Sequence, residues 1–362
     1  MEIEPMGMII KLDVPFRQND KAARQSALLR CFAQDRRNGE DVFWLKENAE
    51  ALNVLESSDA ILPIEALDVY AEFYESLERR IGFFPQYYRF LLSICMDLED
   101  LGIEGGKGAT LAQWVAEQGL AQSELSDLQR AEARRLCLRR GVDPLAGDEG
   151  LEERLRSFAG RRTTFSIPNK KAAYELTHIV FYLSEYGRVD PQLDAEFIDS
   201  LRFSGTLAYL DLNVDLLAEI CIALRFAGQE SPQIWKSWLS EQARNFVLQD
   251  VPHAAQNDDY HQFLMVNWFM RVNGLGGFAH QIPDGLVRFI QADPGRGPLR
   301  DMSEQMYGMD GARSSDWEKM RSALSEALSD DARAVLNAAE ASIDKFDEFF
   351  SGFSRTDLQE RK

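Results

Sequence analysis

Residues 170–188 of the chain read KKAAYELTHIVFYLSEYGR. Apolar residues recur in this segment every three or four positions, and that spacing predicts one amphipathic helix. Pro168 precedes the segment and Gly187 lies near its end, and these residue types often begin and end a helix. The helix carries Glu175 and His178 one turn apart, in a chain with only four histidines. The segment therefore predicts both the fold class and the place of a candidate site.

Most of the remaining chain has the same organisation. Apolar residues at helical spacing recur between short joints that contain Gly, Pro or Asn, which is typical of stacked antiparallel helical pairs. We therefore expect an all-α fold, either solenoid-like or closed as an α/α toroid. Strand-like alternation occurs only in residues 8–14. We expect further helices in residues 231–250 and around 286–290, and a mobile loop that contains Met302, Met306 and Met309.

Three parts are distinguishable along the chain. We expect an N-terminal helical domain in residues 1–145, a helical domain with the candidate site in 146–300, and a C-terminal helical tail in 301–362. The first boundary rests on residues 141–150, where Pro144, Gly147 and Gly150 lie among acidic residues and few are apolar.

Composition limits the partners and the compartment. The net charge of −19 disfavours nucleic acid and anionic membranes, because binding to phosphates needs a concentrated positive field. No apolar window is long enough to cross a bilayer and no secretory leader is visible, so we expect a cytoplasmic protein. The four cysteines lie far apart in apolar contexts and are expected to be reduced core residues: Cys31, Cys95, Cys137 and Cys221.

The candidate site combines histidines and carboxylates from three expected helices. Glu175 and His178 are three positions apart, so both can point into one space, and Tyr182 extends the same stripe. Asp215 and Glu219 share one side of an otherwise apolar helix. Two further residues, Asp258 and His261, repeat the acid-x-x-His spacing at the start of a third helix.

This set of side chains resembles the ligands of a non-haem iron or zinc site. We assign the metal ligands to His178, His261, Asp215, Glu219 and Asp258, and the catalytic roles to Glu175 and Tyr182. The leading hypothesis is a metal-dependent enzyme that acts on a small molecule or peptide.

Other functions remain open on the sequence alone. Both histidines could be structural, packed and hydrogen-bonded to a carbonyl or a carboxylate. His178 with a neighbouring carboxylate could also act as a general base without a metal. A third alternative is a non-catalytic helical interaction protein, whose acidic surface favours a basic protein partner. The sequence does not indicate an oligomeric state.

The phrase YELTHIVFYLSEYG at residues 174–187 resembles one in uncharacterised bacterial helical proteins. Later phrases of these proteins are similar to DLLAE at residues 215–219 and to Tyr260-His261. The resemblance covers residues 168–275 and implies an all-helical bacterial domain, in some cases encoded near natural-product genes. It implies no particular activity.

Overall fold

The computed structural model describes residues 16–58, 60–252 and 257–356. These residues form seventeen α-helices and one two-stranded antiparallel sheet, which confirms the all-α class. The expected extended segment at residues 8–14 lies outside the described ranges. The helices of the first half are α1 (Phe16–Arg30), α2 (Val42–Glu56), α3 (Ala71–Glu75), α4 (Leu77–Phe83), α5 (Tyr88–Leu101), α6 (Lys107–Glu117), α7 (Asp127–Leu138) and α8 (Leu151–Ala159).

The second half contains the remaining helices and both strands. They are α9 (Lys170–Leu183), α10 (Ala195–Leu210), α11 (Val214–Phe226), α12 (Gln233–Gln242), β1 (Phe246–Asp250), α13 (Tyr260–Val272), β2 (Val287–Gln291), α14 (Leu299–Gly308), α15 (Trp317–Glu326), α16 (Asp330–Glu340) and α17 (Phe346–Ser354). A short 3₁₀ helix, η4 (Arg162–Ser166), precedes α9.

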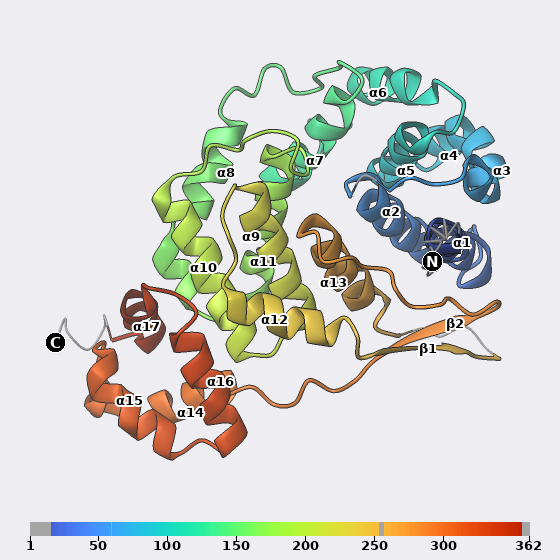
Figure 1. The fold of residues 1–362 in the computed structure, drawn as a ribbon. Coiled ribbons are helices and arrows are strands. Elements are labelled where there is room, and N and C mark those ends of the chain that lie inside the picture. Colours follow the sequence, from blue (N-terminus) through green and yellow to red (C-terminus); the bar gives the residue numbers. More distant parts are fainter. Residues whose placement is uncertain (1–15, 59, 253–256, 357–362) are drawn as a thin grey trace, which may run out of the picture.

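The helices form an arc with α9, α11 and α13 on its inner side (Figure 1). Helix α11 packs against α9, α10, α12 and α13, and α13 also contacts α2. Helix α11 is buried on nearly all sides, from Leu216 through Leu224, as expected for a helix that is apolar all round. This packing brings a helix from the first 60 residues against helices from the second half.

Local signals explain the bounds of α9. The side chain of Asn169 accepts a hydrogen bond from the backbone N–H of Ala172 and caps the helix. The helix ends at Leu183, earlier than residue 188, because Glu185, Tyr186 and Gly187 all adopt positive φ angles. A Cβ at Gly187 would lie 2.5 Å from the ring of Phe226, so this turn is held tightly against the end of α11.

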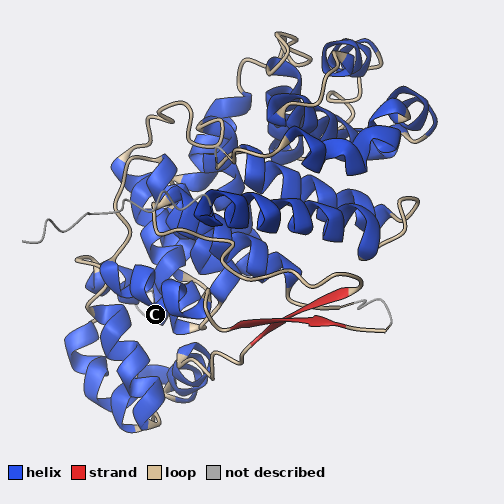
Figure 2. Ribbon diagram, turned by 45° about the vertical axis from the view of Figure 1, so that its right-hand side comes forward, coloured by secondary structure: helices blue, strands red, loops and turns tan. Residues whose placement is uncertain are grey.

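Two segments differ from the expected secondary structure. Residues 246–250 and 287–291 are the paired strands β1 and β2 rather than parts of helices, and this two-stranded sheet lies along one side of the helical body (Figure 2). In β2, Val287 and Phe289 are buried and Arg288 is exposed, the period of two that a half-buried strand shows. The expected mobile loop is helix α14, in which Met302 and Met306 are buried.

The cysteines are free and buried, as expected. Burial raises the pKa of each of the four thiols, which keeps them protonated at neutral pH. None of the helices in the described ranges is both long and apolar enough to cross a bilayer. The division into domains at residues 145 and 300 stays a prediction.

The contact between α10 and α12 gives a first testable prediction. A Cβ at Gly205 would lie 2.5 Å from the fully buried ring of Trp235. We expect Gly205→Ala to lower the free energy of unfolding by about 1–3 kcal/mol through overpacking, as measured by urea denaturation. Gly82→Ala is the control, because no atom lies within 4 Å of its added Cβ. Equal effects of the two substitutions would contradict the prediction.

Candidate functional site

A cavity of about 440 Å³ lies between α2, α9, α11 and α13. We call it the histidine cavity. Polar and charged side chains converge on one part of it, and aromatic rings line another. The residues that line it are Lys46, Glu50, Asn53, Val54, Tyr174, His178, Phe181, Tyr186, Asp215, Glu219, His261, Met265 and Trp268.

The carboxylates of α11 are fixed by neighbouring hydroxyl groups. Asp215 and Glu219 are four residues apart and therefore share one face of the helix. The hydroxyl of Tyr174 donates a hydrogen bond to Asp215 Oδ2 over 2.8 Å. The hydroxyl of Thr177 donates to Glu219 Oε2 over 2.6 Å. Only 2% of the Glu219 side chain is exposed, so this carboxylate needs the polar partners that surround it.

Both histidines face the buried carboxylate of Glu219. His178 Nε2, from α9, lies 3.9 Å from Glu219 Oε2. His261 Nε2, from α13, lies 3.7 Å from Glu219 Oε1 and 3.6 Å from Asp215 Oδ2. On its other side, His261 Nδ1 lies 3.4 Å from Glu50 Oε2 of α2. Four helices thus contribute one continuous group of two imidazoles and three carboxylates.

Burial and charge act in opposite directions on the protonation of this group. Burial alone would lower the pKa of His261, but its interactions with Glu219 and Glu50 outweigh burial and raise the pKa to about 10. Burial alone would raise the pKa of Glu219, but His261, His178 and Thr177 hold it below its ordinary value. At neutral pH the centre therefore contains a charged imidazolium between carboxylates.

An aromatic cluster forms the apolar wall of the cavity. The ring centroids of Phe181 and Trp268 lie 5.1 Å apart, and those of Tyr186 and Trp268 lie 5.8 Å apart. Behind the wall, the guanidinium of Arg135 lies 4.2 Å from the centroid of the Tyr186 ring. An apolar wall beside a few convergent polar groups is typical of small-molecule sites.

The structure brings together four of the seven candidate residues, His178, Asp215, Glu219 and His261. Glu175 does not line the cavity, and its side chain is 37% exposed with Lys171 Nζ at 3.9 Å. Tyr182 does not line it either. Its ring stacks on the ring of His178 with centroids 6.0 Å apart, so it supports the imidazole from behind.

Asp258 belongs to a different buried cluster. Its carboxylate accepts hydrogen bonds from Arg36 and from the backbone N–H of Phe289. Arg36 also binds Glu47. The acid-x-x-His spacing of Asp258 and His261 therefore has a structural cause, because Asp258 precedes α13 and points toward β2.

Three residues of the site were not found from the sequence: Glu50, Tyr174 and Thr177. Tyr174 lies one turn before His178 on the same helix, and Thr177 directly precedes it, so their closeness in sequence was a usable signal. Glu50 lies 211 residues before His261, and no local pattern indicates that α2 packs against α13.

The expected metal centre is not evident in the geometry. Among the residues that the structure describes, no group of three or more His, Cys, Asp or Glu side chains is arranged to hold a metal ion. Within the group of two imidazoles and three carboxylates, the shortest nitrogen–oxygen distances join His261 to Glu50, Asp215 and Glu219. These contacts form an ion-pair network around a protonated imidazole.

Comparison with protein families gives a match that covers nearly the whole chain. A family described as a domain of unknown function, DUF6902, matches residues 6–356. The chain belongs to the DUF6902 family. All four helices that form the histidine cavity lie within the matched range, so the cavity is part of the DUF6902 domain. No curated protein and no solved structure matches the chain.

Proposed function

We propose that this DUF6902 protein is an enzyme that acts on a small molecule in the histidine cavity by acid–base chemistry. The observation that supports the proposal is that His178 and His261, from separate helices, both face the buried Glu219 beside an aromatic wall. The cavity volume of about 440 Å³ lies within the usual range of ligand sites, about 300–1,000 Å³.

His178 is the group proposed to exchange a proton with the substrate. Its side chain is 40% exposed, whereas Glu219 is almost fully buried. With Nε2 protonated and directed at Glu219, Nδ1 is free to accept a proton, and Glu219 stabilises the imidazolium that forms. Tyr182, stacked on the His178 ring, limits the rotation of the base.

The charges of the cavity restrict the class of substrate. Glu50, Asp215 and Glu219 carry three negative charges, against Lys46 and the protonated His261. The resulting negative field favours a neutral or cationic molecule over an anion. The aromatic wall of Phe181, Tyr186 and Trp268 adds a surface for an apolar or planar part of that molecule.

A second candidate is a mononuclear iron or zinc enzyme. His261 Nε2 lies 3.6 Å from Asp215 Oδ2 and 3.7 Å from Glu219 Oε1, and an ion with bonds of about 2.0–2.2 Å could bridge either pair. The metal must first displace the proton of His261, so its apparent affinity falls as the pH falls.

The acid–base proposal is tested with a substrate screen and matched variants. A panel of neutral, cationic and anionic small molecules is screened by thermal shift, and turnover of the binders is followed by NMR. We expect His178→Gln to lower the turnover rate roughly 100- to 10,000-fold with little change in binding. Glu175→Gln is the control, because it lies on the same helix outside the cavity.

The same experiment separates the alternatives. Equal rate losses in His178→Gln and Glu175→Gln, or an absence of any binder in the panel, would refute the acid–base proposal. Tightly bound iron or zinc in the purified protein, lost in His261→Gln, would favour the metalloenzyme. A stoichiometric basic protein partner without turnover would favour the interaction protein.

A further inference from the structure

A further cavity, of about 690 Å³, lies between α1, α13, the turn after α12 and the loop that follows α13. We call it the basic pocket, because its lining includes Lys21, Arg24, Arg244, Arg271 and His280. It shares no lining residue with the histidine cavity. Its volume lies within the usual range of ligand sites, about 300–1,000 Å³, so a small organic molecule fits.

The lining of the basic pocket is positively charged, although the chain as a whole is acidic. Lys21, Arg24, Arg244 and Arg271 are cationic, and none of the described residues that line the pocket is an Asp or a Glu. Burial lowers the pKa of His280, so its imidazole is neutral at neutral pH. The backbone of Arg244 contacts this imidazole, so Arg244 lies beside the loop after α13. A cavity lined by one sign of charge concentrates ions of the opposite sign.

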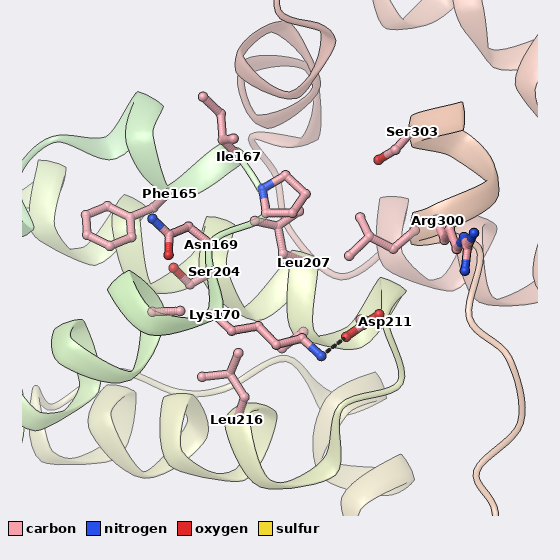
Figure 3. A pocket seen from close by; sticks show the side chains of 14 residues that line it. Phe165, Ile167, Asn169, Lys170, Ser204, Leu207, Asp211, Leu216, Arg300 and Ser303 are labelled. Carbon is pink, nitrogen blue, oxygen red and sulfur yellow. Dashed lines mark ion pairs between the residues drawn. The ribbon is translucent and has the colours of Figure 1, made fainter. Parts of the chain in front are cut away.

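The cations of this pocket differ from those of a third cavity, which lies beside α14 (Figure 3). There, Lys170 Nζ lies 2.8 Å from Asp211 Oδ2, and both residues line the same cavity. In the basic pocket, the side chains of Lys21 and Arg244 form no ion pair or hydrogen bond with any described residue, and both residues are exposed. Their charges are therefore available to an anionic ligand.

Two arginines approach adjacent positions of the loop after α13. Arg24 Nε donates a hydrogen bond to the backbone oxygen of Phe278 over 3.2 Å. The Cγ of Arg271 lies 2.9 Å from the position that a Cβ at Gly277 would take. Gly277 and Phe278 are consecutive, so the two arginines lie on the same part of the loop. Lys21 precedes Arg24 by three residues and therefore lies one turn away on α1.

The loop also contains backbone donors that the fold does not use. The buried Phe278 fixes the loop, because its N–H donates to Asn267 Oδ1 over 2.6 Å. The N–H groups of Gly276, Gly277 and Ala279 make no hydrogen bond with any described residue. Gly276 and Gly277 have φ angles of 99° and 109°, which glycine adopts readily. Backbone N–H groups of such glycine-containing turns are typical donors to phosphate oxygens.

We propose that the basic pocket binds a small organic phosphate, and that it prefers two phosphate groups to one. A phosphate monoester carries a charge of about −1.5 to −2 at pH 7. Two such groups therefore balance the four positive charges of the lining. Arginine is well suited to this ligand, because its guanidinium presents parallel N–H donors that match the geometry of phosphate oxygens.

The lining also restricts the organic part of the ligand. None of the described residues that line the pocket is Phe, Tyr or Trp, so a nucleobase finds no such ring on which to stack. A sugar or polyol bisphosphate therefore fits the pocket better than a nucleotide does.

The test is calorimetric titration of the full chain, at constant ionic strength, with fructose 1,6-bisphosphate, fructose 6-phosphate, fructose and adenosine diphosphate. We expect fructose 1,6-bisphosphate to bind most tightly and fructose not to bind. Lys21→Gln and Arg244→Gln should each weaken the bisphosphate roughly 10-fold, because each removes one charged donor. Lys171→Gln is the control, because it removes a cation that is 87% exposed and lies outside the pocket, on α9.

NMR titration locates the bound phosphate. The amide signals of Gly276, Gly277 and Ala279 should shift with fructose 1,6-bisphosphate but not with fructose, and the double variant Lys21→Gln with Arg244→Gln should lose these shifts. The proposal is overturned if neither fructose phosphate binds to the wild type, or if Lys171→Gln weakens binding as much as the pocket variants do. Tighter binding of adenosine diphosphate, or shifts confined to the histidine cavity, would also overturn it.

Discussion

Replacement of Arg36 by methionine should lower the free energy of unfolding by about 3–5 kcal/mol. Arg36 lies between α1 and α2, and its guanidinium binds two carboxylates, with 2.8 Å to Glu47 Oε2 and 2.8 Å to Asp258 Oδ2. The three side chains are 1–3% exposed. The substitution removes the counter-charge of Asp258 without returning that carboxylate to water, and such an uncompensated buried charge is strongly destabilising.

Arg36 also connects parts of the chain that are distant in sequence. Its Nη1 donates to the backbone oxygen of Val287 in β2 over 2.8 Å. Its guanidinium lies 5.1 Å from the ring centroids of Tyr260 and Phe289. Strand β2, the start of α13 and α2 therefore share one cation. We expect the loss of Arg36 to loosen the β1–β2 sheet first, which hydrogen exchange of the β2 amides would detect.

Two variants control the Arg36 measurement, which uses urea denaturation followed by circular dichroism. Arg300→Met removes an exposed cation paired with Glu304 and should not change the unfolding midpoint. The triple variant Arg36→Met, Glu47→Met and Asp258→Leu removes all three buried charges and should recover much of the loss. If Arg36→Met is as stable as Arg300→Met, the buried cluster does not stabilise the fold.

The helices around the histidine cavity could be predicted because their signals are local. The caps Asn169 and Asn213 each accept a hydrogen bond from a backbone N–H of the first turn, and apolar periodicity continues from there. The convergence of His178, Asp215, Glu219 and His261 could also be predicted, since they are polar residues on largely apolar helices. Such residues need one another, or another polar partner, when they are buried.

The remaining features depend on contacts that the sequence does not reveal. The strands β1 and β2 have five residues each, and their pairing partners Phe246 and Gln291 are 45 positions apart in the sequence (291 − 246). Glu50 reaches His261 only because α2 packs on α13. Glu175 shares a helix with His178, but side chains three residues apart do not point in the same direction around the helix axis. The rotation is enough for Glu175 to lie outside the cavity, beside Lys171, while His178 faces Glu219 of α11.

The stability of the protein should decrease as the pH rises from about 7 to 10 because of His261. Its pKa is about 10 in the folded protein, against an ordinary value of 6.5. A raised folded-state pKa means that the full stabilisation is present below pH 6.5 and is lost as the pH rises through 10. One pKa unit corresponds to about 1.4 kcal/mol. Because the imidazole is 29% exposed, we expect a loss on the order of 2–4 kcal/mol.

The charged groups around His261 account for the size and the sign of this effect. Glu50 faces Nδ1, and Asp215 and Glu219 face Nε2. Lys46 approaches Glu50 to 3.7 Å and slightly weakens its attraction for the imidazolium. When His261 loses its proton above neutral pH, three carboxylates remain close together without that cation. Their mutual repulsion then destabilises the contact between α2, α11 and α13.

His261→Gln is the variant that isolates this contribution. Glutamine preserves the hydrogen-bonding character of the site but has no proton to lose, so the unfolding free energy of the variant should fall less steeply than that of the wild type between pH 7 and 10. The four buried thiols have raised pKa values in the folded protein, so they also lower the stability as the pH rises above about 8, but they do so equally in the wild type and in His261→Gln. The difference between the two profiles therefore isolates His261. Urea denaturation at each pH gives the two profiles. If the profiles of the wild type and His261→Gln have parallel slopes, His261 does not carry the positive charge in the cavity. The two histidines would then exchange the roles proposed for them, with His178 charged and His261 exchanging the proton with the substrate.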